Sequence, residues 1–432
     1  MPIRECTIFD CTEPKNPRPM AAFALDDAGN GHLGYGRHYI TTPKAFPIDP
    51  LQLPLGPDPH LVTRFSDGSY GALSDAGPNA WGQKLTASLC KSDMKPIPAT
   101  PVEWFLQSWH FGSGCLGFGL SHQAPPNIGI QASSVSDLSS RILSQIDKVV
   151  ENGDGDLDLE ARQLLAPGSS LGGLRPKTLV MHEGREYIAK FSRPDDFFDV
   201  PKAEYATLRM AHLAKIKVPD FELIDVAGKS VLIICRFDRT DDGKRLHYLS
   251  AHSVLGINSV TPELYVTKFS YAGFAESLRQ RTKFAREDSH ELFRRMAFNV
   301  LTGNIDDHLR NHALIRDLNG IYRLSPAFDL VPHREASNLH HSIGIGAQGP
   351  VASIENVLSQ AGRFLLPPQE AKLIVEEVRE VVSHWPKMMQ EAGLTRSDVL
   401  KLKSSFEIVD AYTKPLVSGI AAPESCASIR PK

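Results

Sequence analysis

The alternation of hydrophobic and polar residues divides the chain into a β-rich first half and a helical second half. Short apolar runs bounded by glycine, proline and other turn residues predict strands at 21–25, 60–64, 178–182, 186–191, 221–226 and 230–235. From about residue 262 the apolar positions recur every three or four residues, as Leu292, Met296 and Val300 do, and this spacing predicts helices. We therefore expect an α+β fold.

Turn and capping signals locate individual elements. Thr100 and Glu103 form a capping box, which predicts that a helix begins there. Glu183-Gly184 and Asn319-Gly320 are turn dipeptides between apolar runs, so they predict two hairpins, at 178–191 and 313–324. Further helices are expected at 135–149, 201–215, 368–390 and 395–412.

Composition excludes several classes of protein. Hydrophobic residues make up 42% of the 432 residues, which is too many for a wholly disordered chain. The net charge of −3 gives no general attraction to nucleic acid or anionic membranes. The most apolar run, Val231–Cys235, is far shorter than the ~18 residues of a membrane span. Scattered cysteines and the lack of a signal-like N-terminus favour a reducing cytoplasm over a zinc or disulfide protein.

The residues with the clearest chemistry follow the apolar helix around Val300. Asp306 and Asn311 lie five residues apart, and Asp329 follows the second hairpin. Phosphoryl transfer needs such a set, because one aspartate orients the attacking hydroxyl while an amide and a second aspartate hold Mg²⁺. Alternatively, Asp306 only caps a helix and the other two occupy turns. The combined spacing favours a metal and phosphate site.

A cation for the phosphates is also present. Lys190 lies on the predicted strand 186–191, where alternation places it on the same face as Ile188. An inward lysine is costly unless it is paired, and Glu204 in the next helix is the expected partner. The alternative is an ordinary surface lysine.

Two further segments fit nucleotide binding less specifically. The loop Gly168–Gly173 lacks the lysine of a Walker A sequence, because Leu174 stands in its place, but backbone amides at Gly172 and Gly173 can form an anion site. The segment Cys235–Arg239 ends a strand at the point where a two-lobed kinase has its adenine-binding hinge. A plain surface turn and a plain strand end are the alternatives.

Together these residues resemble the HipA-type serine/threonine protein kinase toxins of bacterial type II toxin–antitoxin modules. The similarity rests on four motifs: the catalytic motif Asn304–Asn311, the metal motif Ser325–Asp329, the hinge Cys235–Arg239 and the phosphate loop Ser170–Lys177. The segment Asp75–Gly82 and the turn Gly112–Gly119 also fit the family. Departures from the family pattern are Cys235, where glutamate is usual, and Leu174–Lys177, where the loop differs.

The resemblance implies a two-lobed protein-kinase-like (HipA-like) fold with an N-terminal α/β subdomain and an all-helical C-terminal lobe. We expect an N-terminal α/β subdomain at 1–125, a helix and linker at 126–160, a β-rich nucleotide-binding N-lobe at 161–260, a helical C-lobe with a catalytic hairpin at 261–418, and a flexible tail at 419–432.

The resemblance also implies a role for each matching residue. Asp306 would be the catalytic base, and Asn311 and Asp329 the magnesium ligands. The ATP-binding residues would be Lys190, Gly172, Gly173, Lys177, Cys235, Phe237, Asp238 and His308, with Glu204 as the helix partner of Lys190. Ser170, or its neighbour Ser169, would be autophosphorylated, which ejects the loop and switches the enzyme off.

The function implied is an ATP- and Mg²⁺-dependent protein kinase toxin that inhibits translation through an aminoacyl-tRNA synthetase. Its expected partners are a helix-turn-helix (HipB-like) antitoxin and operator DNA, bound mainly through the antitoxin. Two alternatives stay open: a small-molecule kinase of the aminoglycoside phosphotransferase type, which shares the Asp–Asn spacing, and a non-catalytic kinase-fold co-repressor.

Overall fold

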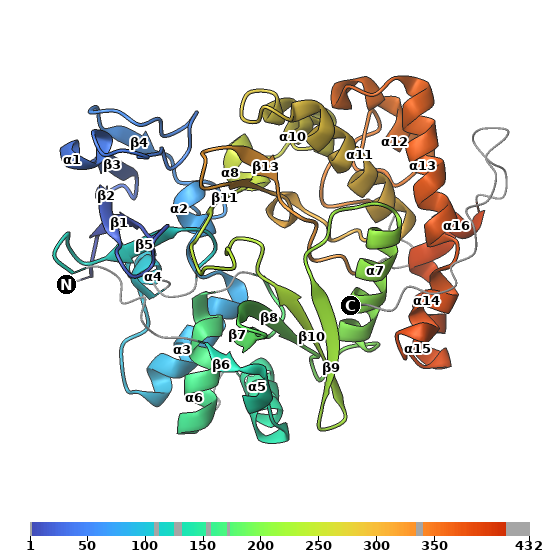
Figure 1. Ribbon diagram of the computed structural model, residues 1–432, viewed down its shortest axis with the longest axis horizontal. Coiled ribbons are helices and arrows are strands. Elements are labelled where there is room, and N and C mark those ends of the chain that lie inside the picture. Colours follow the sequence, from blue (N-terminus) through green and yellow to red (C-terminus); the bar gives the residue numbers. More distant parts are fainter. Residues whose placement is uncertain are drawn as a thin grey trace.

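The computed structural model describes residues 2–107, 112–124, 132–152, 157–170, 173–333 and 340–411. In these ranges the chain forms three β-sheets, each accompanied by helices (Figure 1). The N-terminal sheet has the strand order β4-β3-β2-β1-β5, and α1 to α4 belong to the same part of the chain. Its elements are β1 Glu5–Asp10, β2 Arg18–Leu25, β3 Gly31–Tyr35, β4 His60–Val62, β5 Leu116–Gly119, α1 Arg37–Ile40, α2 Ala72–Asp75, α3 Ala80–Ser92 and α4 Pro101–Gln107.

The second sheet, with the order β6-β7-β8-β10-β9, forms the N-lobe together with α5, α6 and α7. It is antiparallel except for the β6–β7 pair. Its elements are β6 Ser133–Ser134, β7 Lys177–His182, β8 Arg185–Phe191, β9 Phe221–Val226, β10 Lys229–Cys235, α5 Ser140–Asn152, α6 Leu159–Leu165 and α7 Val200–Leu213.

The third sheet, β11-β12-β13, lies among the helices of the C-lobe. Figure 1 shows these helices, gold to red, at the side of the molecule opposite the N-terminal sheet. The elements are β11 His247–Ser250, β12 Ala313–Arg316, β13 Tyr322–Leu324, α8 Ala251–Leu255, α9 Pro262–Val266, α10 Tyr271–Leu278, α11 Ala285–Leu301, α12 Ile354–Ser359, α13 Pro368–Val382, α14 Trp385–Glu391, α15 Arg396–Lys401 and α16 Glu407–Ala411.

Strand β10 is apolar and buried from Val231 to Cys235 because both faces of the N-lobe sheet are covered. Leu232 and Ile234 belong to a large core that includes α7, the N-terminal sheet and the C-lobe. Val231, Ile233 and Cys235 point the other way, into a second core with α5 and α6. Since successive side chains of a strand face opposite sides, this uninterrupted run fits a sheet buried between two helical layers.

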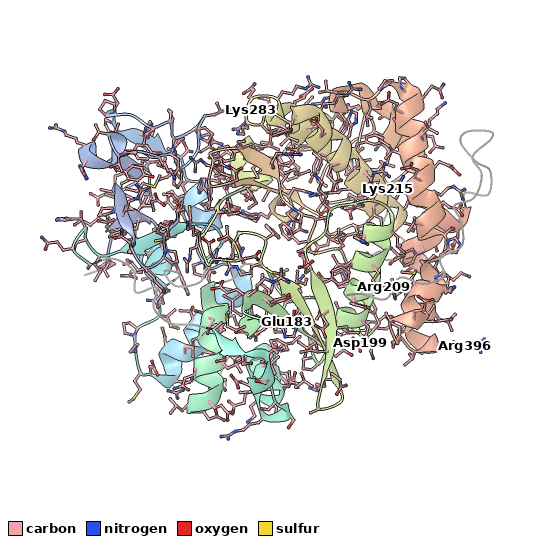
Figure 2. The ribbon with its side chains drawn as sticks, in the orientation of Figure 1. Glu183, Asp199, Arg209, Lys215, Lys283 and Arg396 are labelled. Carbon is pink, nitrogen blue, oxygen red and sulfur yellow. The ribbon has the colours of Figure 1, made fainter. Side chains whose placement is uncertain are left out.

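Several local predictions are confirmed. Glu183, labelled in Figure 2, and Gly184 both have positive φ (49° and 78°) in the tight turn between β7 and β8. The Glu103 amide donates to Thr100 Oγ1 (3.1 Å), and the Thr100 amide donates to Glu103 Oε2 (3.2 Å), so the capping box forms. The hairpin β12–β13 is also present, and the mixed α+β, kinase-like fold class is confirmed.

Three local expectations are wrong. The helix expected from 135 begins at Ser140, because a Ser134–Asp137 capping box closes a separate 3-10 turn first. The helices expected at 368–390 and 395–412 are each interrupted; Pro386 in the first turn of α14 cannot continue a preceding helix. The C-lobe is not all-helical, because β11 pairs with β12 and makes the hairpin at 313–324 part of a sheet.

None of the helices in the described ranges has the length and apolar composition that crossing a membrane requires.

Candidate active site

A cleft of about 900 Å³ lies between the N-terminal helices, the N-lobe sheet and the loop that follows α11. A volume of this size is typical of small-ligand sites. The cleft brings together the following predicted residues: Gly173, Lys177, Lys190, Cys235, Phe237, Asp238, Asp306, His308, Asn311 and Asp329. Glu204 contacts Lys190 from α7. Gly172 lies outside the described residues.

Lys190 joins the two lobes. Its Nζ lies 2.5 Å from Glu204 Oε1 on α7 and 2.8 Å from Asp329 Oδ1 after β13. Burial alone would lower the pKa of Lys190, but the charges of Asp329 and Glu204 raise it above its ordinary value. The lysine is therefore positively charged, and its two carboxylate partners offset the free-energy cost of burying that charge on the inward face of the strand.

Asp329 is held ionised and in an unusual backbone conformation. The Lys190 ammonium is the main reason that the pKa of Asp329 is well below its usual range, although burial opposes this shift. The φ angle of Asp329 is +61°, which lies in the left-handed region. Residues other than glycine rarely adopt this backbone conformation. Backbone strain of this kind is commonly retained at functional sites.

Lys177 provides a second cation directly across the β7–β8 ladder from Lys190. It is buried, and burial together with the Lys190 charge lowers its pKa to about 8, while Asp329 opposes the shift. Gly173 lies against its ammonium: a Cβ there would be 2.4 Å from Lys177 Nζ, and the φ of Gly173 is +90°. The backbone conformation at the end of the loop therefore favours glycine, and a larger residue would have to displace the Lys177 ammonium.

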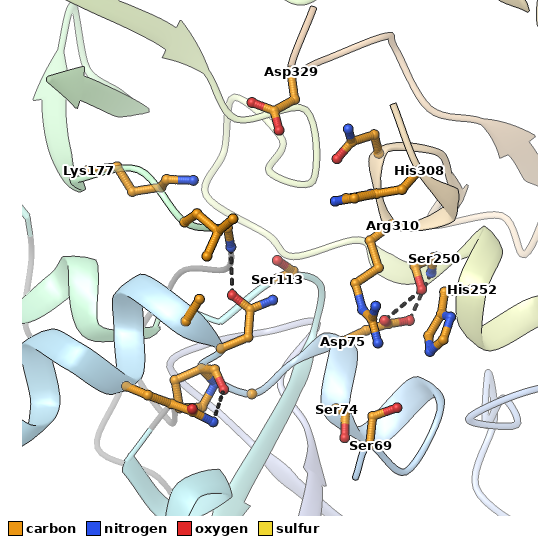
Figure 3. A pocket seen from close by; sticks show the side chains of 18 of the residues that line it. Ser69, Ser74, Asp75, Ser113, Lys177, Ser250, His252, His308, Arg310 and Asp329 are labelled. Carbon is orange, nitrogen blue, oxygen red and sulfur yellow. Dashed lines mark hydrogen bonds between the residues drawn. The ribbon is translucent and has the colours of Figure 1, made fainter. Parts of the chain in front are cut away.

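The loop between α11 and β12 carries Asp306, His308 and Asn311. Asp306 is exposed, whereas Asn311 is buried at the end of a 3-10 turn, Leu309–Asn311. His308 Nδ1 is buried without a hydrogen-bond partner among the described residues. Figure 3 shows the side chains of His308, Asp329 and Lys177 pointing into the same space.

A buried polar network under this loop was missed from the sequence. Asp307 accepts hydrogen bonds from the Tyr271 hydroxyl on α10 and, at 2.8 Å, pairs with His312 Nε2. Burial would raise the pKa of Asp307, but His312 and Tyr271 keep it below its ordinary value. The carboxylate next to Asp306 thus anchors the loop to the C-lobe core. The five-residue spacing to Asn311 selects Asp306, but no sequence signal predicts that its neighbour Asp307 is buried.

Arg310 contacts the N-terminal part of the chain, which sequence reasoning also missed. Its guanidinium pairs with Asp67, and His252 Nε2 on α8 lies 3.2 Å from the same carboxylate. Burial alone would raise the pKa of Asp67, but hydrogen bonds from Ser69 and the neighbouring Arg310 lower it to about 2. Because Asp67 and Arg310 are 243 residues apart, no sequence signal links them.

The predicted hinge residues Cys235, Phe237 and Asp238 all line the cleft, but their contacts differ. The Cys235 amide already donates to Asp220 O (2.8 Å), so it is not free for a ligand. The ring of Phe237 lies 5.4 Å from that of Phe328 at the cleft wall. The carboxylate of Asp238 pairs with Arg236 (2.7 Å), which points to a structural position rather than a ligand contact.

Asp238 also fixes the hinge to the N-terminal sheet. Its carboxylate accepts from the Gly114 amide (2.7 Å) and pairs with Arg239 (3.1 Å). Burial opposes its ionisation, but Arg236 and Arg239 hold the pKa of Asp238 well below its usual range. The Gly112–Gly119 turn is thus attached to the strand end that connects the lobes.

The phosphate-loop serines are only partly described. Ser169 and Ser170 end a 3-10 helix, Ala166–Ser170, and the Ser169 hydroxyl donates to Ala166 O (2.7 Å). The side chain of Ser170 is outside the described part of the chain.

The oxygen donors in the cleft fit Mg²⁺. Asp329 is ionised and Asn311 supplies an amide, and magnesium is commonly held by one or two carboxylates together with substrate phosphates. The described residues contain no group of three or more His, Cys, Asp or Glu side chains placed to bind a metal.

The family is decided by comparison with known sequences. A profile of the HipA-like C-terminal domain matches residues 169–385, which is half of the chain and contains every residue of the cleft discussed above from Gly173 to Asp329. The chain belongs to the HipA-like family. The resemblance stated from the motifs is confirmed.

Individual relatives of this HipA-like protein are distant. A Haemophilus influenzae protein that is named as an unproven kinase is 29% identical over 194 residues, which are 40% of this chain and 55% of the relative. The serine/threonine-protein kinase toxin HipA of Shewanella oneidensis is 23% identical over 193 residues, 38% of this chain and 43% of the toxin. The matches thus span about half the length of these curated relatives.

The solved structure of Shewanella oneidensis HipA, in a complex with HipB and operator DNA, has a similar fold. It superposes with a TM-score of 0.62 at 15% identity and covers 94% of this chain and 97% of its own. At this identity the likeness concerns the fold alone.

Proposed function

We propose that this HipA-like protein is an ATP- and Mg²⁺-dependent serine/threonine protein kinase that acts as a toxin. The observation that carries the proposal is Lys190, held between Glu204 and Asp329 in a cleft that also contains Asp306 and Asn311. A lysine–glutamate pair, two aspartates and an asparagine are the parts that protein kinases use to place a phosphoryl group.

Each of these side chains would have a separate task. Asp306, exposed in the cleft, would accept the proton of the acceptor hydroxyl, while Asn311 and Asp329 would hold Mg²⁺. Lys190 and Lys177 would bind the phosphates beside the Gly172–Gly173 loop, and the hinge backbone at Phe237 would face adenine. ATP supplies the transferred phosphoryl group when bound, and magnesium offsets its negative charge.

Self-modification, target and partners follow from the family. We propose autophosphorylation at Ser170, with Ser169 as the alternative, and inhibition of translation through an aminoacyl-tRNA synthetase. A HipB-like helix-turn-helix antitoxin would bind the protein in the cytoplasm and provide most contacts to operator DNA. The Shewanella oneidensis complex of HipA, HipB and operator DNA supports these partners.

The proposal is tested with labelled ATP, Mg²⁺ and a bacterial lysate. The wild-type protein should label a lysate protein and itself, and phosphopeptide mass spectrometry should place the self-modification at Ser170. Asp306→Ala and Asp329→Ala should label nothing, while Glu183→Ala, at the exposed β7–β8 turn, should behave as wild type. Unchanged labelling by either aspartate variant would contradict the proposal.

The same experiment separates the alternatives. A labelled sugar or amino alcohol without any labelled protein would indicate a small-molecule kinase. Nucleotide binding by calorimetry without transfer to any acceptor would indicate a co-repressor.

A further inference from the structure

A short segment of the N-terminal region, Asp75–Trp81, contacts both lobes of the cleft. It runs from the end of α2 to the first turn of α3. Its first residue bonds the C-lobe, and its last residues bond the phosphate loop and β7 of the N-lobe. Neither the family match, which begins at residue 169, nor the proposed chemistry assigns these residues a task.

At the C-lobe end, Asp75 holds the start of α8. Its carboxylate accepts from the Ser250 amide (2.8 Å) and from the Ser250 hydroxyl (2.7 Å), as Figure 3 shows. Ser250 is the N-cap of α8, and the next amide, of Ala251, donates to His312 O (2.8 Å). His312 directly follows Asn311 and pairs with Asp307, so Asp75 is two hydrogen-bonded steps from the loop that carries Asp306.

At the N-lobe end, Asn79 and Trp81 hold the phosphate loop. Asn79 Oδ1 accepts from the Gly173 amide (2.6 Å), although Asn79 occupies the N-cap of α3, where its side chain would ordinarily bond that helix. The Trp81 amide donates to Gly173 O (2.9 Å), and its indole Nε1 donates to Lys177 O (2.8 Å). Both backbone groups of Gly173 and the carbonyl of Lys177 are thus fixed by a segment outside the kinase lobes.

The segment between these two ends has little freedom. Ala76, Gly77 and Pro78 are buried, and proline fixes its own φ. A Cβ at Gly77 would lie 3.1 Å from the ring of Phe105, so the backbone packs directly on α4. A short, stiff connection transmits position from one end to the other better than a flexible loop would.

We propose that Asp75–Trp81 is an interlobe brace whose Asp75, Asn79 and Trp81 are positioning residues that set the phosphate loop relative to the catalytic loop. The inference rests on the proposed phosphoryl transfer for its purpose, because phosphates near Gly173 and an acceptor near Asp306 must be brought into line across the cleft. The existence of the brace does not depend on catalysis, because it is only a mechanical link between the lobes.

Hydrogen exchange of the Gly173 amide tests the link without catalysis. Asp75→Ala alters the C-lobe end, far along the chain from Gly173, and should speed exchange at Gly173 at least tenfold. Asn79→Ala removes the hydrogen-bond acceptor of the Gly173 amide, so this variant should show the largest increase in its exchange rate. Lys84→Ala, on the exposed face of α3, should leave exchange unchanged. Exchange at Gly173 that is unaffected by Asp75→Ala overturns the brace.

A double-mutant cycle tests its purpose. Asp75→Ala and Asn79→Ala should each lower the kcat of phosphate transfer about tenfold with a smaller change in the KM for ATP. The double variant should lose no more than either single one, because a brace released at one end is already released. Losses that multiply would show two independent local roles and overturn the proposal.

Two milder variants cover the case in which Asp75→Ala does not fold. Ser250→Ala removes only a hydroxyl at the C-lobe end, and Trp81→Phe removes only the indole N–H at the other. The same exchange and cycle results are expected with this pair, and multiplying losses overturn the proposal here too. A wild-type protein that transfers no phosphate would refute the proposed function, whereas the exchange result would still decide the brace.

Discussion

Lys190 Nζ and Asp329 Oδ1 lie 2.8 Å apart, although one belongs to a strand of the N-lobe and the other follows the β12–β13 hairpin of the C-lobe. The same ammonium also contacts Glu204 of α7 (2.5 Å). One cation therefore joins the N-lobe helix, the N-lobe sheet and the segment that follows β13. Any change in the distance between the lobes must alter the contact between Lys190 and Asp329. We therefore expect the activity to depend on how closely the lobes approach each other.

Removing this cation should abolish catalysis. We expect Lys190→Met to lower kcat/KM for phosphate transfer by about 100-fold or more, the size of loss seen when one preorganised electrostatic contact is removed. Glu204→Gln should cause a smaller loss, because Asp329 still holds the lysine. Lys229→Met is the matched control, since Lys229 lies on β10 in an exposed pair with Asp147. Lys190→Met activity within about threefold of wild type contradicts this role.

Gly173 should be needed for nucleotide binding because it lacks a side chain, and not only because of its positive φ. Gly173→Ala places a methyl group 2.4 Å from Lys177 Nζ and must displace the lysine, so the Kd for ATP measured by calorimetry should rise. Gly184→Ala is a control with a similar positive φ (+78°) and open space around its Cβ. Both variants should lose about 1 kcal/mol of stability from backbone strain, but only Gly173→Ala should bind ATP more weakly. Equal ATP affinities would count against the loop contact.

Substitutions of the neighbouring residues Asp306 and Asp307 should have different effects on stability, although both should impair phosphate transfer. Asp307→Asn weakens a buried pair with His312, so we expect about 3 kcal/mol less stability in urea unfolding, together with slower phosphate transfer. Asp306→Asn should change stability by less than about 0.5 kcal/mol, because Asp306 is exposed, yet abolish transfer. A stable Asp307→Asn variant with normal transfer would show that the network does not support the loop.

His247 should make the protein sensitive to acid. Burial is the main reason that its pKa is lowered to about 4, and its Nε2 lies 2.8 Å from Ile48 O of the N-terminal region. The unfolded chain binds a proton at this histidine from about pH 6.5, whereas the folded chain does so only near pH 4. Stability should therefore fall as the pH drops through this window.

The size of this effect is about 3 kcal/mol if the full pKa difference is expressed. Thermal unfolding of wild type and His247→Gln between pH 7 and pH 4 measures it, since glutamine does not titrate. The variant should lose less stability than wild type over this range. Parallel pH curves for the two proteins would exclude His247 as the source.

Local structure was largely readable from the sequence, since it depends on near neighbours. Glu183-Gly184 selects its own turn through positive φ, and Thr100 with Glu103 forms its own cap. The five-residue spacing of Asp306 and Asn311 likewise predicted that these two side chains lie close together, and both line the cleft. The short strand β11 and helix α8 were not predicted, because so few residues carry little periodic signal and their pairing with β12 is long-range.

By itself, the sequence determined the family, most strand and helix types, and the carboxylate, amide and lysine side chains that the cleft brings together. The tertiary structure alone decided that Asp307 is buried in a pair with His312, that Asp238 is bound to Arg236 and Arg239, and that Asp75–Trp81 reaches both lobes. Side-chain chemistry and short-range turns are properties of neighbouring residues. Ion pairs and burial depend on which distant segments the packed core brings together.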